Sequence, residues 1–266
     1  MLKSKKRIIE LRDTYIEYLL TGEENQDTIL FLHGLAADLS QFERQHLFFE
    51  NRYRVLSINL RGHGASIPKG KYSPQIFSLH KFARDIIKVL DKLDIDCAHI
   101  VGNSMGGNIG YELLKTRPDI IRALVTFGTT TKLSTPRFIL FLTDLVYRLL
   151  GMGILARMSK WSARKGYARR KIVQMLSSAD LAAIRCILPN LANLDYLDII
   201  GSTSAPYMMI KCTKDKIINN KIGEIISELE KRDNFKLYEM QEVGHFANLD
   251  NPFLFNKVLD EYLKER

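Results

Sequence analysis

Val101-Gly102-Asn103-Ser104-Met105-Gly106-Gly107 is the stretch that decides the fold. It ends a short apolar run at 98–102, typical of a buried strand, and continues into a helix-length segment at 106–115. Glycines two residues on either side of a serine allow a tight strand-to-helix turn with a strained serine backbone. Such a turn lifts the Ser104 hydroxyl out of the sheet and places the Met105 N–H at a helix N-terminus. We therefore predict that Ser104 is a nucleophile and that Met105 donates a hydrogen bond to an oxyanion.

The rest of the 266-residue chain alternates short apolar runs with helix-length amphipathic segments. Eight of the short runs are predicted as strands, at 7–11, 15–20, 28–32, 54–60, 98–102, 122–127, 206–212 and 235–240. Helical segments are predicted at 79–93, 106–115, 221–231 and 252–264. This pattern predicts an α/β fold, with a mostly parallel sheet of about eight strands and helices on both faces.

Residues 131–204 interrupt this alternation, because they contain several helix-length segments and no convincing strand. In the first helical segment, 137–150, five apolar side chains fall on one side: Phe138, Phe141, Leu142, Leu145 and Leu149. We predict a core formed by residues 1–130 and 205–266, with residues 131–204 inserted as a helical cap.

A serine nucleophile needs a base to accept its proton and an acid to orient that base. His245 follows the last predicted strand, and Asp215 follows the strand at 206–212. Both lie at carboxyl ends of strands, where ligands bind in open α/β sheets. Asp250 is the main competitor for the acid, although its place just before Pro252 favours a capping role. We predict Ser104, Asp215 and His245 as the catalytic residues.

A second oxyanion donor is expected in the loop after the third predicted strand. His33-Gly34-Leu35-Ala36 stands there, and Gly34 allows the backbone to turn so that the Leu35 N–H faces Ser104. The spacing of cysteines and histidines suggests no metal site, and we predict no cofactor.

Together these motifs resemble the α/β-hydrolase family over nearly the whole chain. The stretch Asn59-Leu60-Arg61-Gly62-His63-Gly64-Ala65-Ser66 is similar to the family's Asp-x-Arg-Gly-x-Gly-x-Ser, with Asn59 in place of the acid. The resemblance implies a Ser-His-Asp triad that forms an acyl-enzyme, and a helical cap that sets specificity. It favours a carboxylesterase, or a lipase acting on an acyl lipid such as a monoacylglycerol.

The sequence leaves two alternative functions open. Gly-Asn-Ser-Met-Gly-Gly also resembles the nucleophile motif of hydrolases that cleave carbon–carbon bonds in ring-fission products, although Leu35-Ala36-Ala37-Asp38 replaces their usual glycine-rich loop. A ligand-binding protein that retains the triad without turnover is the other alternative.

The positive charge of the chain is local. Lys and Arg total 39 against 30 Asp and Glu, but residues 131–175 hold ten basic residues and one acidic, leaving 29 of each elsewhere. Three alternatives remain for what this basic segment contacts: an anionic substrate, an anionic membrane surface, or only solvent. We expect no nucleic-acid partner, because the segment offers few aromatic residues and no recognisable module. The predicted partner is a small or lipid-like ester.

The predicted location is the cytoplasm, and peripheral membrane contact through the cap is an open alternative. Cys97, Cys186 and Cys212 are far apart in apolar sequence, which favours a reducing compartment. Lys3 and its basic neighbours are followed by mixed charged and apolar residues, so no secretory leader is expected. Asp144 and Arg148 interrupt the apolar run at 138–156, so we expect no membrane-spanning helix there, and a helix that lies on a membrane surface stays an open alternative.

Overall fold

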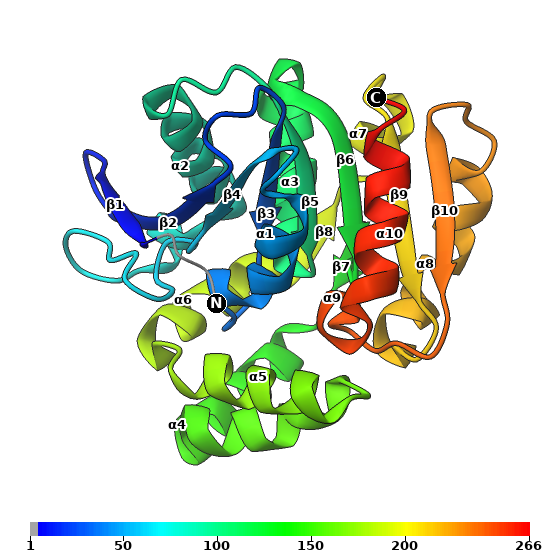
Figure 1. Ribbon diagram of the computed structural model, residues 1–266. Coiled ribbons are helices and arrows are strands. Elements are labelled where there is room, and N and C mark those ends of the chain that lie inside the picture. Colours follow the sequence, from blue (N-terminus) through cyan, green and yellow to red (C-terminus); the bar gives the residue numbers. More distant parts are fainter. Residues whose placement is uncertain (1–4) are drawn as a thin grey trace.

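The computed structural model describes residues 5–266, so Lys3 and the start of the predicted core lie outside the described residues. An eight-stranded sheet forms the centre of the molecule, with helices on both of its faces (Figure 1). Its strands are β1 (Arg7–Glu10), β2 (Tyr15–Thr21), β3 (Thr28–Leu32), β4 (Arg54–Ile58), β5 (Ala98–Asn103), β6 (Ile121–Phe127), β9 (Tyr207–Cys212) and β10 (Phe235–Met240). The predicted fold class is confirmed.

The strand order brings the predicted site residues together at the carboxyl ends of the parallel strands. The order is β1-β2-β4-β3-β5-β6-β9-β10, in which β1 and β2 are antiparallel to their neighbours and the other strands run parallel. The carboxyl ends of β3, β5, β9 and β10 therefore point the same way. The loops that carry Leu35, Ser104, Asp215 and His245 follow these four ends.

Each face of the sheet buries its own hydrophobic core, because successive side chains of a strand point to opposite faces. In β3, Leu30 and Leu32 join one core, whereas Ile29 and Phe31 join the other. The first core is covered by α2 (Leu79–Lys92), α3 (Met105–Thr116) and α8 (Lys216–Leu229). The second is covered by α1 (Glu43–Phe49) and α10 (Pro252–Leu263). Short helices complete the loops: η1 (Leu39–Phe42), η2 (Pro74–Phe77), η3 (Pro118–Ile120) and α9 (Ala247–Asp250).

The segment between β6 and β9 forms several helices and two short strands. Its elements are β7 (Lys132–Ser134), α4 (Arg137–Ser159), η4 (Lys160–Ser162), α5 (Gly166–Ser177), α6 (Leu181–Leu191), β8 (Asn193–Asp195) and α7 (Leu197–Ser202). α4 and α5 form a separate lobe beyond the ends of β6 and β9, whereas α7 packs on α3 (Figure 1). The division into core and cap at 131 and 204 stays a prediction.

The expectation of no strand in this segment was wrong. β7 and β8 pair antiparallel, with Leu133 opposite Leu194, and form a small second sheet. Each strand has three residues, which is too short for an alternating pattern to be visible in the sequence.

Arg61 is anchored although Asn59 replaces the acid of the family motif. The guanidinium is 1% exposed and donates from Nε and Nη2 to the Asp85 carboxylate, at 2.7 Å each, with Asp13 as a further partner at 3.3 Å. Asn59 instead accepts a hydrogen bond from the Leu39 N–H at 2.6 Å. The buried charge is therefore paired by acids from elsewhere in the chain.

Candidate active site

Ser104 lies in the turn between β5 and α3, as predicted from the glycine spacing. Its backbone has φ 53° and ψ −119°, a conformation that L-residues rarely adopt. A Cβ at Gly106 would lie 2.1 Å from the Leu32 carbonyl oxygen, and one at Gly102 would lie 2.5 Å from the Gly106 backbone. Both glycines are therefore required by close backbone approach. The turn places Ser104 on the wall of a cavity.

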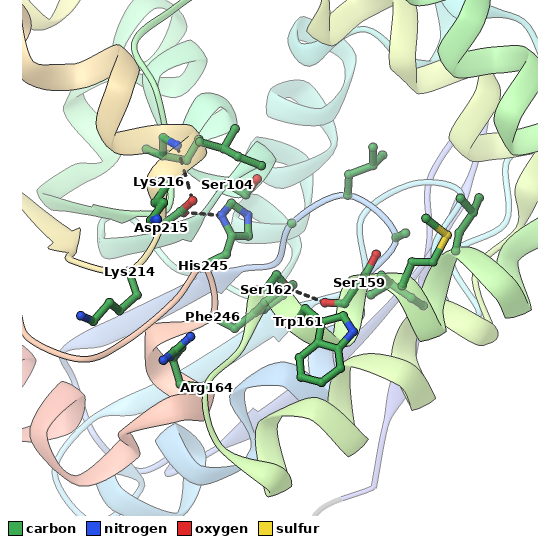
Figure 2. Close-up of a pocket in the computed structure, with 18 of the residues that line it drawn as sticks. Ser104, Ser159, Trp161, Ser162, Arg164, Lys214, Asp215, Lys216, His245 and Phe246 are labelled. Carbon is green, nitrogen blue, oxygen red and sulfur yellow. Dashed lines mark hydrogen bonds and ion pairs between the residues drawn. The ribbon is translucent and has the colours of Figure 1, made fainter.

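His245 and Asp215 come together from two different loops. The Nδ1 of His245 is 2.6 Å from Oδ2 of Asp215, whose side chain is buried. Asp215 also begins α8, where its Oδ1 accepts the Ile218 N–H. Figure 2 shows both side chains with Ser104 around the same part of the cavity. Among the described residues no hydrogen bond joins Ser104 Oγ to the imidazole; the geometry brings the three together without that contact.

Two backbone N–H groups near Ser104 are available as donors. Neither the Leu35 N–H nor the Met105 N–H donates to another atom within residues 5–266. Met105 is the first residue of α3, whose first-turn N–H groups have no partner inside the helix. Leu35 follows Gly34, where an added Cβ would lie 3.2 Å from Ser104 Cβ. The loop after β3 thus passes directly against the serine.

His33 and His63 hold that loop through hydrogen bonds to backbone groups. His63 Nε2 accepts the Ala36 N–H at 3.1 Å, and His33 Nε2 accepts the Leu60 N–H at 3.0 Å. The Nδ1 of His33 lies 2.8 Å from the Gly34 carbonyl and must donate to it, so this imidazole is neutral. Burial lowers the pKa of His33 to about 4 and that of His63 to about 3. Both side chains hold the conformation around Ala36, whose φ is 62°.

Because of these buried histidines, we expect the free energy of unfolding to fall in acid. Burial also lowers the pKa of His46 to about 3, whereas an unfolded histidine titrates near 6.5. Below pH 6.5 the unfolded chain takes up protons that the folded chain excludes, so stability is complete above 6.5 and falls as the pH falls toward 4. At pH 5 each imidazole is expected to cost about 2 kcal/mol of unfolding free energy. Urea unfolding followed by circular dichroism at pH 7.5 and pH 5 measures the difference.

Replacing one of these buried imidazoles tests the cause. His46→Gln is expected to reduce the pH dependence of the unfolding free energy, because it removes one of the three groups. A urea midpoint that does not change between the two pH values would contradict the prediction.

The cavity around Ser104 has a volume of about 690 Å³ and a largely apolar wall. Its polar end contains Ser104, Asp215 and His245. The apolar wall comes mainly from α4, η4 and α5: Tyr147, Met152, Leu155, Met158, Trp161 and Leu176. Three cationic residues, Arg164, Lys214 and Lys216, also line it (Figure 2). Within residues 5–266 no group of three or more His, Cys, Asp or Glu side chains is placed to hold a metal ion.

Asn103 is a further residue of the site, and no sequence motif predicted a role for its side chain. Its Nδ2 donates to the carbonyl oxygens of Phe127 and His245, both at 3.1 Å, and its Oδ1 accepts from Gln41 at 3.0 Å. Gln41 also donates to Asn248 at 3.2 Å. An amide beside the serine was the only signal of this network in the sequence. Asn103 therefore links the serine turn to the histidine loop.

The histidine loop is also held by the segment that follows α4. The His245 N–H donates to the Ser162 carbonyl at 3.0 Å. Asp250 accepts the backbone N–H groups of Gly244, Arg164 and Lys165 at 2.8, 2.7 and 2.9 Å. Asp250 thus contacts backbone rather than the imidazole, and Asn251 is the residue that caps α10. Asp250 therefore joins the histidine loop to the backbone at residues 164 and 165.

Comparison with known proteins identifies a common fold. A family model described as the alpha/beta hydrolase fold matches residues 27–161. 3-Oxoadipate enol-lactonase 2 of Acinetobacter baylyi is 26% identical to this chain, and the alignment covers 97% of each. The crystal structure of the enol-lactonase from Burkholderia xenovorans superimposes with a TM-score of 0.83 at 21% identity, covering 97% of this chain and all of that one. An esterase from Exiguobacterium antarcticum gives 0.85 at 20% identity, covering 98% and 100%. The two solved structures show a shared architecture.

Proposed function

This chain belongs to the alpha/beta hydrolase fold family, and from that premise we propose that it is a serine hydrolase that cleaves carboxylic esters through an acyl-enzyme. The observation that carries the proposal is the contact between His245 Nδ1 and Asp215 Oδ2 at 2.6 Å, in a cavity that also contains Ser104. Relatives named as enol-lactonases and esterases support the hydrolysis of esters at a coarse level.

Acylation follows from the placement of the imidazole nitrogens. Because Nδ1 donates its hydrogen to Asp215, the lone pair of Nε2 is left to accept the Ser104 proton. The serine oxygen then attacks the ester carbonyl carbon, and the carbonyl oxygen becomes an oxyanion. The free N–H groups of Leu35 and Met105 are the proposed donors to that oxyanion. His245 returns the proton to the leaving alcohol as the carbon–oxygen bond breaks, which leaves an acyl-serine.

Deacylation uses the same groups in the reverse direction. Water loses a proton to His245 and attacks the acyl carbon, so the second oxyanion forms in the same place. The bond to Ser104 breaks, the serine recovers its proton from His245, and a carboxylic acid is released. Asp215 stabilises the imidazolium in both steps without itself taking a proton.

The cavity wall supports a substrate with an apolar acyl chain. Most of the residues contributed by α4 and α5 are hydrocarbon or thioether side chains, including Met152, Leu155 and Leu176. Burial of one methylene is worth about 0.8 kcal/mol, which is close to fourfold in kcat/KM. We therefore propose an acyl ester, with an acyl lipid such as a monoacylglycerol as its natural form, rather than a small polar ester.

A p-nitrophenyl ester series from acetyl to palmitoyl tests this proposal. We expect kcat/KM to rise by up to about fourfold for each methylene until the chain fills the cavity, and a fluorophosphonate probe to label the protein once. An enol-lactone and a ring-fission dienol are included as competing substrates. Folded protein that neither turns over esters nor is labelled would contradict the proposal. Cleavage of the dienol alone would indicate a carbon–carbon hydrolase, and saturable ester binding without turnover a binding protein.

A further inference from the structure

The apolar side of α4 faces solvent, not the protein interior. Phe138, Phe141 and Leu149 are 67%, 64% and 74% exposed, and Leu142 and Leu145, which share their side of the helix, are each 39% exposed. Tyr147, which lies on another side of the helix, instead packs against the hydrophobic core and lines the cavity. A surface helix normally has the opposite arrangement, with its apolar stripe buried. This stripe therefore needs an apolar environment that the described chain does not supply.

The length and composition of this segment point toward a membrane. Residues Arg137–Ser162 are long and apolar enough to cross one, yet only 6% of their most apolar stretch is buried. A core helix would be mostly buried, and a leader would stand near the N-terminus. The segment bends at Gly151, where φ is 65°, and Asp144 forms ion pairs with Arg148 and with Arg185 of α6. A bent helix that is held by ion pairs to a neighbouring helix fits a position on the surface of a bilayer better than a position across it.

The exposed apolar side chains continue beyond the bend to the mouth of the cavity. Ile154, Met158 and Trp161 are 47%, 59% and 65% exposed, and Met158 and Trp161 also line the cavity. Ile217, at the start of α8, is 75% exposed and lines it too. We call the exposed apolar side chains of α4 and η4 the docking face: Phe138, Phe141, Leu142, Leu145, Leu149, Ile154, Met158 and Trp161. The cavity opens beside this face.

Unpaired cations lie in the same part of the chain as the docking face. Of the ten basic residues at 131–175, three pair with acids: Lys132 with Asp195, Arg148 with Asp144, and Lys171 with Glu43. Among the described side chains the other seven form no salt bridge: Arg137, Arg157, Lys160, Arg164, Lys165, Arg169 and Arg170. Two of them lie over the Trp161 ring, Lys160 at 5.0 Å and Arg169 at 4.5 Å from its centroid. Aromatic and basic side chains together are typical of interfacial helices.

We propose that the docking face binds the surface of an anionic lipid bilayer. The apolar side chains would enter the boundary between headgroups and acyl chains, while the unpaired cations would contact anionic headgroups. A second copy of this chain is disfavoured as the occupant, because it would bring two sets of seven unpaired cations together. Nucleic acid would satisfy the cations but leave the apolar stripe in water.

Docking would place the cavity mouth at the lipid surface, because Met158 and Trp161 belong both to the docking face and to the cavity lining. An acyl lipid could then enter the cavity without passing through water. This last step rests on the proposed ester hydrolysis, whereas the binding to the bilayer does not.

Co-sedimentation of the full chain with vesicles tests the docking face. The vesicles are phosphatidylcholine alone, or phosphatidylcholine with phosphatidylglycerol, each at low and at physiological salt. We expect binding to the anionic vesicles that weakens as salt is added. The triple variant Phe138→Gln, Phe141→Gln, Leu149→Gln is expected to bind at least about a hundredfold more weakly. Its matched control replaces three apolar residues exposed elsewhere, Ile8→Gln, Ile67→Gln and Phe253→Gln, and is expected to bind as the parent does.

A second variant isolates the charge. Arg137→Gln, Arg157→Gln, Arg170→Gln is expected to lower affinity for anionic vesicles about a hundredfold, whereas Lys71→Gln, Lys221→Gln, Lys236→Gln is not. Absence of binding to anionic vesicles at low salt would overturn the proposal, as would equal losses in variants and controls. So would a stable dimer that the apolar variant dissociates. Turnover of p-nitrophenyl butyrate, measured in the same samples without vesicles, reports on the hydrolase proposal separately.

Discussion

Replacing Ser104 with alanine is expected to lower kcat/KM for p-nitrophenyl esters by about ten-thousand-fold or more. The hydroxyl oxygen is the atom proposed to form the acyl-enzyme. Ser104 is the residue between the end of β5 and the start of α3. A small residual rate is expected, because the free N–H groups of Leu35 and Met105 remain. Alanine keeps the strained φ of 53° that this position requires, so the fold is expected to stay intact.

The measurement combines steady-state kinetics with fluorophosphonate labelling and circular dichroism. Ser104→Ala should lose the label and keep the spectrum. Ser178→Ala, an exposed serine after α5, is the control and should keep both the label and the rate. Turnover or labelling that survives in Ser104→Ala would show that another residue is the nucleophile.

Replacing Asp215 with asparagine is expected to lower kcat/KM by about a thousandfold to ten-thousandfold. The carboxylate oxygen 2.6 Å from His245 Nδ1 requires the hydrogen of the imidazole to be on Nδ1. An asparagine can place its amide N–H there instead, which moves the hydrogen to Nε2 and removes the lone pair that would accept the serine proton. The loss is expected in kcat, with little change in the affinity for the ester.

Asp250→Asn distinguishes the two candidate acids. Asp250 accepts three backbone N–H groups through both carboxylate oxygens, and an asparagine would turn its NH₂ toward at least one of them. We expect a loss of stability of about 1–3 kcal/mol and a smaller loss of kcat/KM than for Asp215→Asn. If Asp250→Asn lost more activity than Asp215→Asn while both stayed folded, Asp215 would not be the acid.

The sheet and the serine turn could be predicted because their signals are local. A buried strand is a short apolar run, and the strained turn requires glycines at fixed distances from Ser104. Relations between distant residues had no such signal. Asn103 contacts the carbonyl of His245 and the amide of Gln41, and neither contact follows from the residues next to it. β7 and β8 were missed because a three-residue strand gains its stability from its partner.

Two properties of the cap follow from the sequence. Residues 131–175 carry all of the excess positive charge, and the helical segment at 137–150 has one apolar side. Helical period alone places Phe138, Phe141, Leu142, Leu145 and Leu149 together. The direction in which that side faces depends on how α4 packs in the folded protein. Tyr147 and Leu155 pack against the core. The same packing turns the stripe outward, because a helix cannot bury opposite sides against one neighbour. Likewise, His245 and Asp215 are 30 residues apart, and their contact exists because β9 and β10 are adjacent and parallel.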